Sequence, residues 1–317
     1  MVSVRTVQKN GTDHTSKKVR VMMQQFQWYP GHMTKAKRAM QDDIKLVDMV
    51  IELVDARVPQ ASRNPDIDKL SQGKARVIIL NKADLADERQ NQAWKAYFEK
   101  QGCHVLALDA RVRGSVKRVL DLIGEAGKAK LERDRKRGIR NRPIRAMVAG
   151  IPNVGKSTFI NSIAGKAAAK TGNKPGVTRG NQWIKLNKSV ELLDTPGILW
   201  PKFEDQTVGL HLALIGSIRD DIMNTTELAC ALILFLNDNY KGLLEQRYAL
   251  DAFEVSTVVE AAAVMEKIAV YRHCLSKGGT ADIDKAAALV LDDFRSGRLG
   301  RISLEKPECS ADTHGVE

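Results

Sequence analysis

A short loop near the middle of the chain has the composition of a phosphate-binding site. Gly150, Gly155, Lys156 and Ser157 fit the pattern G-x-x-x-x-G-K-[ST], in which backbone N–H groups surround the phosphates. The lysine of this pattern reaches the β and γ oxygens, and the serine hydroxyl binds magnesium. An apolar strand is expected at residues 144–149, and a helix from about Lys156 turns its positive end toward the anion. The sequence therefore predicts a nucleotide-phosphate cradle.

A second motif, Asn81-Lys82-Ala83-Asp84, follows a predicted strand at residues 76–80. The Asp84 carboxylate can accept hydrogen bonds from N1–H and the exocyclic amine of guanine, whereas adenine lacks this pair of donors. We expect Asn81 to tie this loop to the phosphate loop, and the Lys82 stem to lie over the base plane. The tetrapeptide alone is weak evidence, but beside a phosphate loop it is strong evidence for guanine recognition.

Three further segments could complete the same pocket. In Asp109-Ala110-Arg111, the Ala110 N–H would donate to guanine O6, and Asp109 stands where a serine is usual. Thr178 is the predicted switch threonine, with its hydroxyl on magnesium and its N–H on the γ-phosphate. In Asp194-Thr195-Pro196-Gly197, Asp194 would hold magnesium through water and the Gly197 N–H would sense the γ-phosphate.

Ordinary GTPases begin with the phosphate loop, whereas in this chain the base-reading motif comes first. The motifs therefore occur in a rotated order. The pocket can still close, since the termini of compact domains often lie close together. The rotated order resembles the ribosome biogenesis GTPase A family, as do four segments: Trp28-Tyr29-Pro30-Gly31-His32-Met33, Asp55-Ala56-Arg57-Val58-Pro59, residues 150–157, and Asp293-Phe294-Arg295-Ser296-Gly297-Arg298-Leu299-Gly300.

The resemblance covers about residues 26–305. It implies a circularly permuted GTPase that acts late in assembly of the large ribosomal subunit, with a helical C-terminal domain that helps to engage ribosomal RNA. The sequence departs from the family at Asp109, in a long N-terminal arm and in an acidic C-terminal half. RNA contact in that half needs a local basic face, for which Arg295, Arg298 and Arg301 are the candidates.

Motifs and resemblance together predict one site. The nucleotide (GTP or GDP) would contact Asn81, Lys82, Asp84, Asp109, Ala110, Asn153, Val154, Gly155, Lys156, Ser157, Thr158, Thr178 and Gly197, and Mg²⁺ would be held by Ser157, Thr178 and Asp194. Lys156 and Thr178 are also the expected catalytic groups for in-line attack of water on the γ-phosphate.

The water needs a positioning group. Ile198 stands where a Ras-like protein has glutamine, so hydrolysis by the free protein is expected to be slow and stimulated by a ribosomal particle. The resemblance favours His32 as a group that orients or polarises water; the alternative is a turn histidine. Asn153 resembles the asparagine with which related GTPases hold a potassium ion; the alternative is a loop-stabilising amide.

Composition and charge limit the other possibilities. The 317 residues, 43% hydrophobic and 28% charged, are typical of soluble globular proteins. The four cysteines show no C-x-x-C or metal-like spacing, which predicts reduced thiols. The longest apolar run, residues 228–236, is too short to span a bilayer. We expect a cytoplasmic protein that is monomeric when free, although the basic, acid-poor residues 1–25 leave an organellar matrix open.

Positive charge is concentrated in one part of the chain. Residues 1–200 hold 38 Lys and Arg against 19 Asp and Glu, whereas residues 201–317 hold 12 against 19. This division predicts a polyanionic partner, most plausibly nucleic acid. Residues 128–142 contain eight Lys and Arg with two acids, and they form either a solvated helix end or a nucleic-acid contact.

The predicted fold class is α/β, with a P-loop GTPase domain of circularly permuted motif order followed by a smaller all-α domain. The expected divisions are a flexible arm (1–25), the GTPase domain (26–200), the helical domain (201–305) and a disordered tail (306–317). Asp55 and Arg57 form either a polar turn or a functional pair at a strand end. The large-subunit precursor and its ribosomal RNA are the expected partners; the alternatives are an RNA-binding scaffold that uses GTP as a structural ligand, or a GTPase of tRNA modification.

Overall fold

A computed structural model describes residues 31–112, 114–139, 142–165, 182–195, 205–218, 220 and 223–307. The described chain folds into two compact units. The α/β unit contains the residues up to 195, residues 215–218 and the residues from 301 onward, and the helical unit contains residues 205–214 and 220–300.

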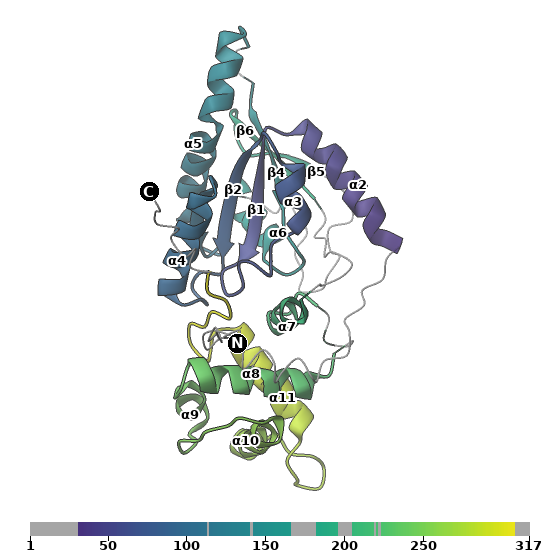
Figure 1. The fold of residues 1–317 in the computed structure, drawn as a ribbon, viewed down its shortest axis with the longest axis vertical. Helices are drawn as coiled ribbons and strands as arrows, with labels where there is room; N and C mark the ends of the chain where they lie inside the picture. The colour runs from purple at the N-terminus through teal and green to yellow at the C-terminus, as the bar shows by residue number, and fades with distance from the viewer. Residues whose placement is uncertain are drawn as a thin grey trace, which may run out of the picture. The chain divides into compact units, whose positions relative to one another are not determined.

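A six-stranded sheet forms the centre of the α/β unit (Figure 1), with strand order β3-β2-β1-β4-β6-β5. The strands are β1 (Met49–Asp55), β2 (Ala75–Asn81), β3 (His104–Leu108), β4 (Ile144–Ala149), β5 (Gln182–Lys185) and β6 (Val190–Asp194). Neighbours pair in parallel, except that the edge strand β5 runs antiparallel to β6. The strand order reverses between β1 and β4, and ligands bind at such switch points beyond the carboxyl ends of the strands.

Helices cover both faces of this sheet, which explains why all seven residues of β1 are buried. These helices are α2 (Gly31–Leu46), α3 (Pro65–Leu70), α4 (Glu88–Lys100), α5 (Ser115–Lys136) and α6 (Lys156–Ala164). Residues of α2, α3 and α4 enclose two apolar clusters on one face, around Val50 and Val54. On the other face α5 packs so closely that a side chain at Gly127 would collide with Ile144. Figure 1 shows α5 extending past the end of the sheet.

Local signals in the sequence set several of these boundaries. The Asp87 side chain accepts a hydrogen bond from the Arg89 N–H and starts α4. Helix α3 is absent from the sequence-based expectation, although Asn64 caps it and Pro65 occupies its first turn, the usual signature of a helix start. The strands predicted at residues 76–80 and 144–149 are present as β2 and β4, and the helix predicted from about Lys156 is α6.

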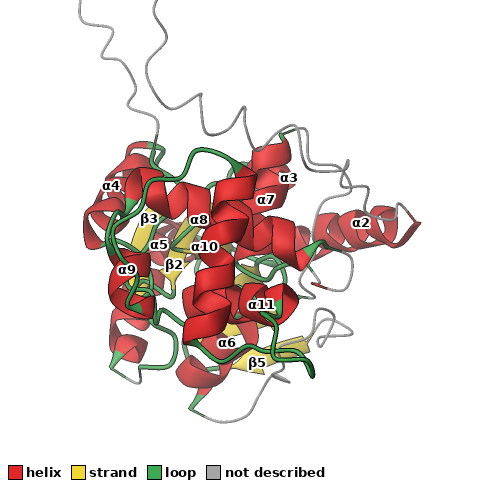
Figure 2. Cartoon of the chain, turned by 90° about the horizontal axis from the view of Figure 1, so that it is seen from below, coloured by secondary structure: helices red, strands yellow, loops and turns green. Residues whose placement is uncertain are grey.

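The helical unit contains α7 (Gln206–Leu214), α8 (Thr225–Asn239), α9 (Leu243–Tyr248), α10 (Val258–Tyr271) and α11 (Ile283–Arg295). Figure 2 shows these elements in red. The apolar run of residues 228–236 lies in α8 and is buried except at Phe235. A reciprocal capping box of Thr257 and Glu260 begins α10. Among the described residues, none of the helices combines the length and the apolar character needed to cross a bilayer.

The arginines proposed as a basic RNA-binding face make internal contacts instead. Arg295 pairs with Asp220 at 2.7 Å and donates to the Leu214 carbonyl. Arg298 donates to the buried carboxylate of Asp293, and Arg301 pairs with Glu88 at 2.7 Å. These pairs offset the positive charge, which disfavours the three arginines as a common RNA-binding face.

Residues 301–307 pack on the α/β unit rather than with the helices. The Ile302 N–H donates to the Leu85 carbonyl at 2.9 Å, and the Leu304 N–H donates to the Arg57 carbonyl at 2.8 Å. The Glu305 carboxylate accepts hydrogen bonds from the backbone N–H groups of Gln60 and Ala61. This arrangement differs from the sequence-based division, which ended the helical domain at residue 305. Side-chain patterns in the sequence give little sign of this docking, because most of its hydrogen bonds involve backbone groups.

Candidate nucleotide-binding site

The phosphate loop joins β4 to α6. Its two glycines are required because other atoms lie too close to leave room for a side chain. A Cβ atom at Gly150 would lie 2.8 Å from the Leu53 carbonyl oxygen. Gly155 has a φ of +92° in the left-handed region, and a Cβ there would lie 2.4 Å from the Asn81 amide nitrogen. The pattern of glycines recognised in the sequence therefore has a steric cause in the fold.

Asn81 connects three loops that are far apart in the chain. Its amide nitrogen donates to the Val154 carbonyl at 2.7 Å, and its amide oxygen accepts from the Ala110 N–H at 3.0 Å. The neighbouring Lys82 ammonium donates to the Asn153 carbonyl at 2.7 Å. The predicted tie between the base-reading loop and the phosphate loop is thus present. The Ala110 N–H, predicted to serve guanine O6, contacts Asn81 in this structure.

Lys156 and Asp194 join the phosphate loop to the Asp-Thr-Pro-Gly segment. The Lys156 ammonium lies 2.7 Å from an Asp194 carboxylate oxygen and also donates to the Thr195 carbonyl. Both side chains are buried. Burial lowers the pKa of Lys156, and the nearby Asp194 carboxylate opposes that shift. Ser157 follows in the first turn of α6, so hydroxyl and carboxylate oxygens suited to magnesium converge on this region.

The Asp55 side chain contacts the base-reading loop. Its buried carboxylate accepts from Arg57 at 2.8 and 2.9 Å and pairs with Lys82 at 2.9 Å. Burial alone would raise the pKa of Asp55, but Arg57 and Lys82 outweigh it and hold that pKa well below its ordinary value. Asp55 and Arg57 therefore form a buried ion pair that also holds Lys82, the residue that follows Asn81, and a functional role for the pair stays a prediction.

Arg111 bridges the two acidic residues expected beside the base. One guanidinium nitrogen lies 2.6 Å from an Asp84 carboxylate oxygen, and Nε lies 2.9 Å from Asp109 Oδ1. The Arg111 N–H also donates to Asp109. The sequence predicts Asp109 as a nucleotide contact that departs from the usual serine, and it gives Arg111 no role. The signal that could have found it is an arginine two residues after an acid in a base-binding loop.

A segment of residues 215–218 contacts the phosphate loop and also escaped sequence reasoning. The Asn153 amide nitrogen donates to the Gly216 carbonyl at 2.6 Å, and the Ser217 hydroxyl donates to the Pro152 carbonyl at 2.8 Å. Ser217 is fully buried. Asn153 has a φ of +64°, which asparagine tolerates better than most residues. These contacts hold the loop in which Val154 is buried and Thr158 half-buried at the start of α6.

Other predicted site residues fall outside this description. Thr178, Gly197 and Ile198 lie outside the described residues. His32 lies in the first turn of α2, but its side chain is likewise outside them. The potassium contact of Asn153 and the water-positioning role of His32 therefore stay predictions.

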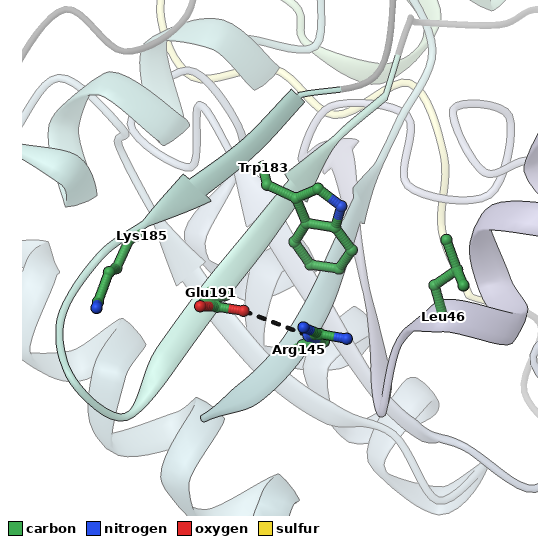
Figure 3. Close-up of a pocket in the computed structure, with 5 residues that line it drawn as sticks. All are labelled: Leu46, Arg145, Trp183, Lys185 and Glu191. Carbon is green, nitrogen blue, oxygen red and sulfur yellow. Dashed lines mark hydrogen bonds and ion pairs between the residues drawn. The ribbon is translucent and has the colours of Figure 1, made fainter. Parts of the chain in front are cut away.

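A surface pocket lies apart from these motifs, toward the amino ends of the parallel strands (Figure 3). It has a volume of about 360 Å³ and is lined by Leu46, Arg145, Trp183, Lys185 and Glu191. The Arg145 guanidinium carbon lies 5.1 Å from the Trp183 ring centroid, and its Nε lies 3.3 Å from Glu191. Trp183 is 42% exposed. This pocket has no glycine loop, so it is a feature separate from the nucleotide site.

Four predicted motifs lie at the carboxyl edge of one sheet, each directly after a strand. The phosphate loop comes after β4, the base-reading loop after β2, the Ala110 loop after β3, and the Asp-Thr-Pro-Gly segment after β6. Fold and site define a P-loop GTPase whose motif order is circularly permuted. Residues 145–267 match the family described as 50S ribosome-binding GTPase; this match begins at β4, so the base-reading motif lies before it.

Comparison with known proteins identifies the family. The chain is 47% identical to "Ribosome biogenesis GTPase A" of Priestia megaterium over 283 residues, which cover 89% of this chain and 97% of the relative. It is 34% identical to "Mitochondrial ribosome-associated GTPase 1" of Mus musculus, covering 89% and 91% of the two chains. The solved structure "GNP-bound YlqF from T. maritima" aligns with a TM-score of 0.61 and 30% identity, covering 86% of this chain and 99% of the other. The chain belongs to the ribosome biogenesis GTPase A family.

Proposed function

We propose that this GTPase acts late in maturation of the large ribosomal subunit and that it binds the precursor particle through ribosomal RNA. The relatives named for ribosome biogenesis and for association with mitochondrial ribosomes support this assignment. The observation that carries the GTPase part is the convergence of the base-reading loop and the phosphate loop through Asn81.

In this proposal the nucleotide spans the carboxyl edge of the sheet. Asp84 reads the guanine edge and Lys156 neutralises the β and γ oxygens. Ser157 and Asp194, joined by the predicted Thr178, would hold Mg²⁺, because their hydroxyl and carboxylate oxygens suit a hard cation. When bound, Mg²⁺ would offset the negative charge that develops on the phosphate oxygens. Gly197 would report the γ-phosphate to the segment that leads into the helical unit.

Two candidates would supply what hydrolysis lacks: His32, which would orient the attacking water, and a potassium ion held by Asn153, which would take the place of an arginine finger beside the phosphates. Comparing turnover in potassium and sodium buffers tests the ion: equal rates would remove it from the mechanism. For His32, the informative variant is His32→Ala. Retained GTP affinity with unchanged particle-stimulated turnover would show that His32 does not act on the water.

The projecting end of α5 is the surface best suited to RNA phosphates. Arg133, Arg135, Lys136 and Arg137 are exposed there, beyond the end of the sheet (Figure 1). Such clustered charge gains affinity for RNA by releasing counterions. The exposed Trp183, next to Arg145 and Lys185, adds a ring on which an unpaired base can stack. RNA contact thus falls to the α/β unit, which also carries the excess of positive charge.

Sedimentation of cell extracts with a non-hydrolysable GTP analogue tests the function. We expect the protein to migrate with large-subunit particles and to leave them when GDP replaces the analogue. Absence from these particles would overturn the assignment. Binding to particles irrespective of nucleotide would favour a scaffold that uses GTP as a structural ligand, and co-migration with tRNA would favour a role in tRNA modification. We place this activity in the cytoplasm or, for an imported chain, in an organellar matrix, with a monomer as the free form.

A further inference from the structure

The carboxylate expected to read guanine already accepts a hydrogen bond from within the chain. Arg111 Nη2 lies 2.6 Å from Asp84 Oδ2, the closest of the contacts that Arg111 makes with the two acids. The same guanidinium is anchored by Nε to both oxygens of Asp109, at 2.9 and 3.1 Å. One cation therefore contacts both of the carboxylates that are expected beside the base.

The chemistry of the two donors is closely matched. Guanine offers N1–H and an exocyclic amine on one carbon, which is a planar N–C–N group with parallel N–H bonds. An arginine guanidinium is also a planar N–C–N group with N–H donors in a fixed fork. Each presents the pattern that a carboxylate binds best. Arg111 Nη2 already occupies Asp84 Oδ2, an oxygen that the guanine base would also need.

We propose that Arg111 competes with the guanine base for the Asp84 carboxylate and so sets the affinity of this protein for guanine nucleotides. The proposal rests on the assignment of Asp84 as the guanine reader. Arg111 acts through Asp84, which makes it a positioning residue rather than a catalytic one. Because the base is common to substrate and product, the competition weakens GTP and GDP binding by the same factor and speeds GDP release.

Asp109 explains how the competition can be reversible. The carboxylate at position 109 holds Arg111 through both its N–H and its Nε, so the guanidinium keeps one partner when the base takes Asp84. This also accounts for an acid where related loops have serine. Arg111 is largely exposed, with 66% of its side chain accessible, so water solvates it in either position. The energy at stake is that of an exposed pair, which is small.

Binding of fluorescent GDP and GTP to the full-length protein, with Arg111→Ala as the variant, measures the effect. We expect Arg111→Ala to tighten both nucleotides by about two- to fivefold, the range for an exposed ion pair, and to slow GDP release by a similar factor. Arg111→Lys keeps the charge without the planar fork and is expected to fall between the two. The difference should narrow as salt is raised from about 0.05 to about 0.5 M, because salt screens exposed charges.

Two controls separate this inference from simpler effects. Arg118→Ala removes an exposed arginine of α5 and is expected to leave both affinities unchanged. In an Asp84→Asn background, where the amide suits the C2 carbonyl of xanthine, Arg111→Ala should not tighten xanthine nucleotides, since its partner charge is gone. Tightening of equal size in both backgrounds would overturn the proposal.

The remaining outcomes are also decisive. If Arg111→Ala weakens guanine nucleotides or leaves their affinity unchanged while selectivity over adenine persists, Arg111 does not compete with the base and the inference is wrong. If the unaltered protein binds ADP as well as GDP, the assignment of Asp84 fails instead, and the inference falls with it. The two failures are thus told apart by the selectivity of the unaltered protein.

Discussion

The side-chain amide of Asn81 donates to the carbonyl of Val154, 73 residues further along the chain, at 2.7 Å. This contact brings together in space two motifs that the rotated order separates in the sequence. Both groups are buried, and a buried acceptor without its donor costs about 1 to 3 kcal/mol. The base-reading loop and the phosphate loop are therefore joined into one cooperative structure. Changes at their contact should affect the binding of the base and of the phosphates together.

Gly155→Ala tests that contact from the phosphate loop. An added Cβ would lie 2.4 Å from the Asn81 amide nitrogen, on a backbone with φ of +92°, so the variant must displace Asn81. We expect at least about a tenfold loss of GDP affinity, as two loops lose their registry. Gly165→Ala is the matched control, because Gly165 also has a positive φ, +66°, but no atom near its added Cβ. It should cost roughly 1 to 2 kcal/mol of stability and leave GDP affinity within twofold.

Asn81→Ala approaches the same contact from the other side. The change leaves the Val154 carbonyl without its donor and the Ala110 N–H without its acceptor. We expect unfolding in urea to require about 1 to 3 kcal/mol less free energy, with a weakened affinity for GDP. Asn237→Ala serves for comparison, since Asn237 is a buried asparagine of the helical unit that donates to the Val255 carbonyl, and it should lower stability without changing GDP affinity. An Asn81→Ala protein that binds GDP normally would refute the coupling.

Most of the fold could be predicted from the sequence, for identifiable reasons. Strands β1 and β2 are mostly apolar, with Glu52 and Arg76 as the breaks, and motif-bearing loops follow them. The Asp87 side chain caps α4. The short α3 was missed because six residues give too little periodicity. Apolar residues at i, i+3 and i+4 spacing predict one helix over residues 208–218, yet α7 ends at Leu214 and the next residues contact the phosphate loop. Apolar spacing alone does not reveal where a helix stops when tertiary hydrogen bonds end it.

In the candidate site, too, some residues could be predicted from the sequence and others could not. Gly155, Lys156 and Asn81 could be found because backbone conformation and phosphate chemistry restrict them to particular residue types. The contact of Arg111 with Asp84 spans 27 residues, and it depends on how two strand ends are placed beside each other. The docking of residues 301–305 uses backbone groups of loops, for which side-chain patterns carry little information.

The buried pair of Asp55 and Arg57 predicts a pH dependence of stability. Since the pKa of Asp55 is lowered in the folded protein, its stabilising contribution is complete above about pH 4, the ordinary range of an aspartate, and is lost as pH falls further. Asp55→Asn should lower the free energy of unfolding at pH 7 by roughly 3 to 5 kcal/mol, because Arg57 is left buried without its charge partner. The deficit should shrink below about pH 4 in urea titrations.

Asp42→Asn is the control for that experiment. Asp42 pairs with Lys45 at 2.8 Å, but both side chains are about three-quarters exposed, so the variant should change stability little at any pH. A deficit for Asp55→Asn that stays constant from pH 7 to pH 3 would show that the carboxylate charge is not what stabilises this region.

The basic end of α5 predicts a salt-dependent affinity for RNA. Arg135→Ala with Lys136→Ala removes two exposed charges and should weaken binding to ribosomal RNA fragments. If each of the two side chains contacts one phosphate, the slope of log affinity against log salt should also fall by roughly 1.4 to 1.8, which is about 0.7 to 0.9 for each contact. Lys267→Ala with Lys277→Ala removes two exposed lysines of the helical unit and should leave RNA affinity unchanged. Equal losses in both double variants would assign the effect to net charge rather than to this surface.

Trp183 allows stacking to be separated from charge on the same unit. Its ring is 42% exposed on the edge strand β5, and Arg145 lies 5.1 Å from its centroid. Stacking of one base on an aromatic ring contributes about 1 to 3 kcal/mol, so Trp183→Ala should weaken binding of single-stranded ribosomal RNA at least about fivefold. Trp183→Phe keeps an aromatic face and should retain most of the affinity. The salt slope should be the same in both, because no charge is removed. If Trp183→Phe loses as much affinity as Trp183→Ala, stacking is not the interaction, and if neither loses any, RNA does not occupy the pocket.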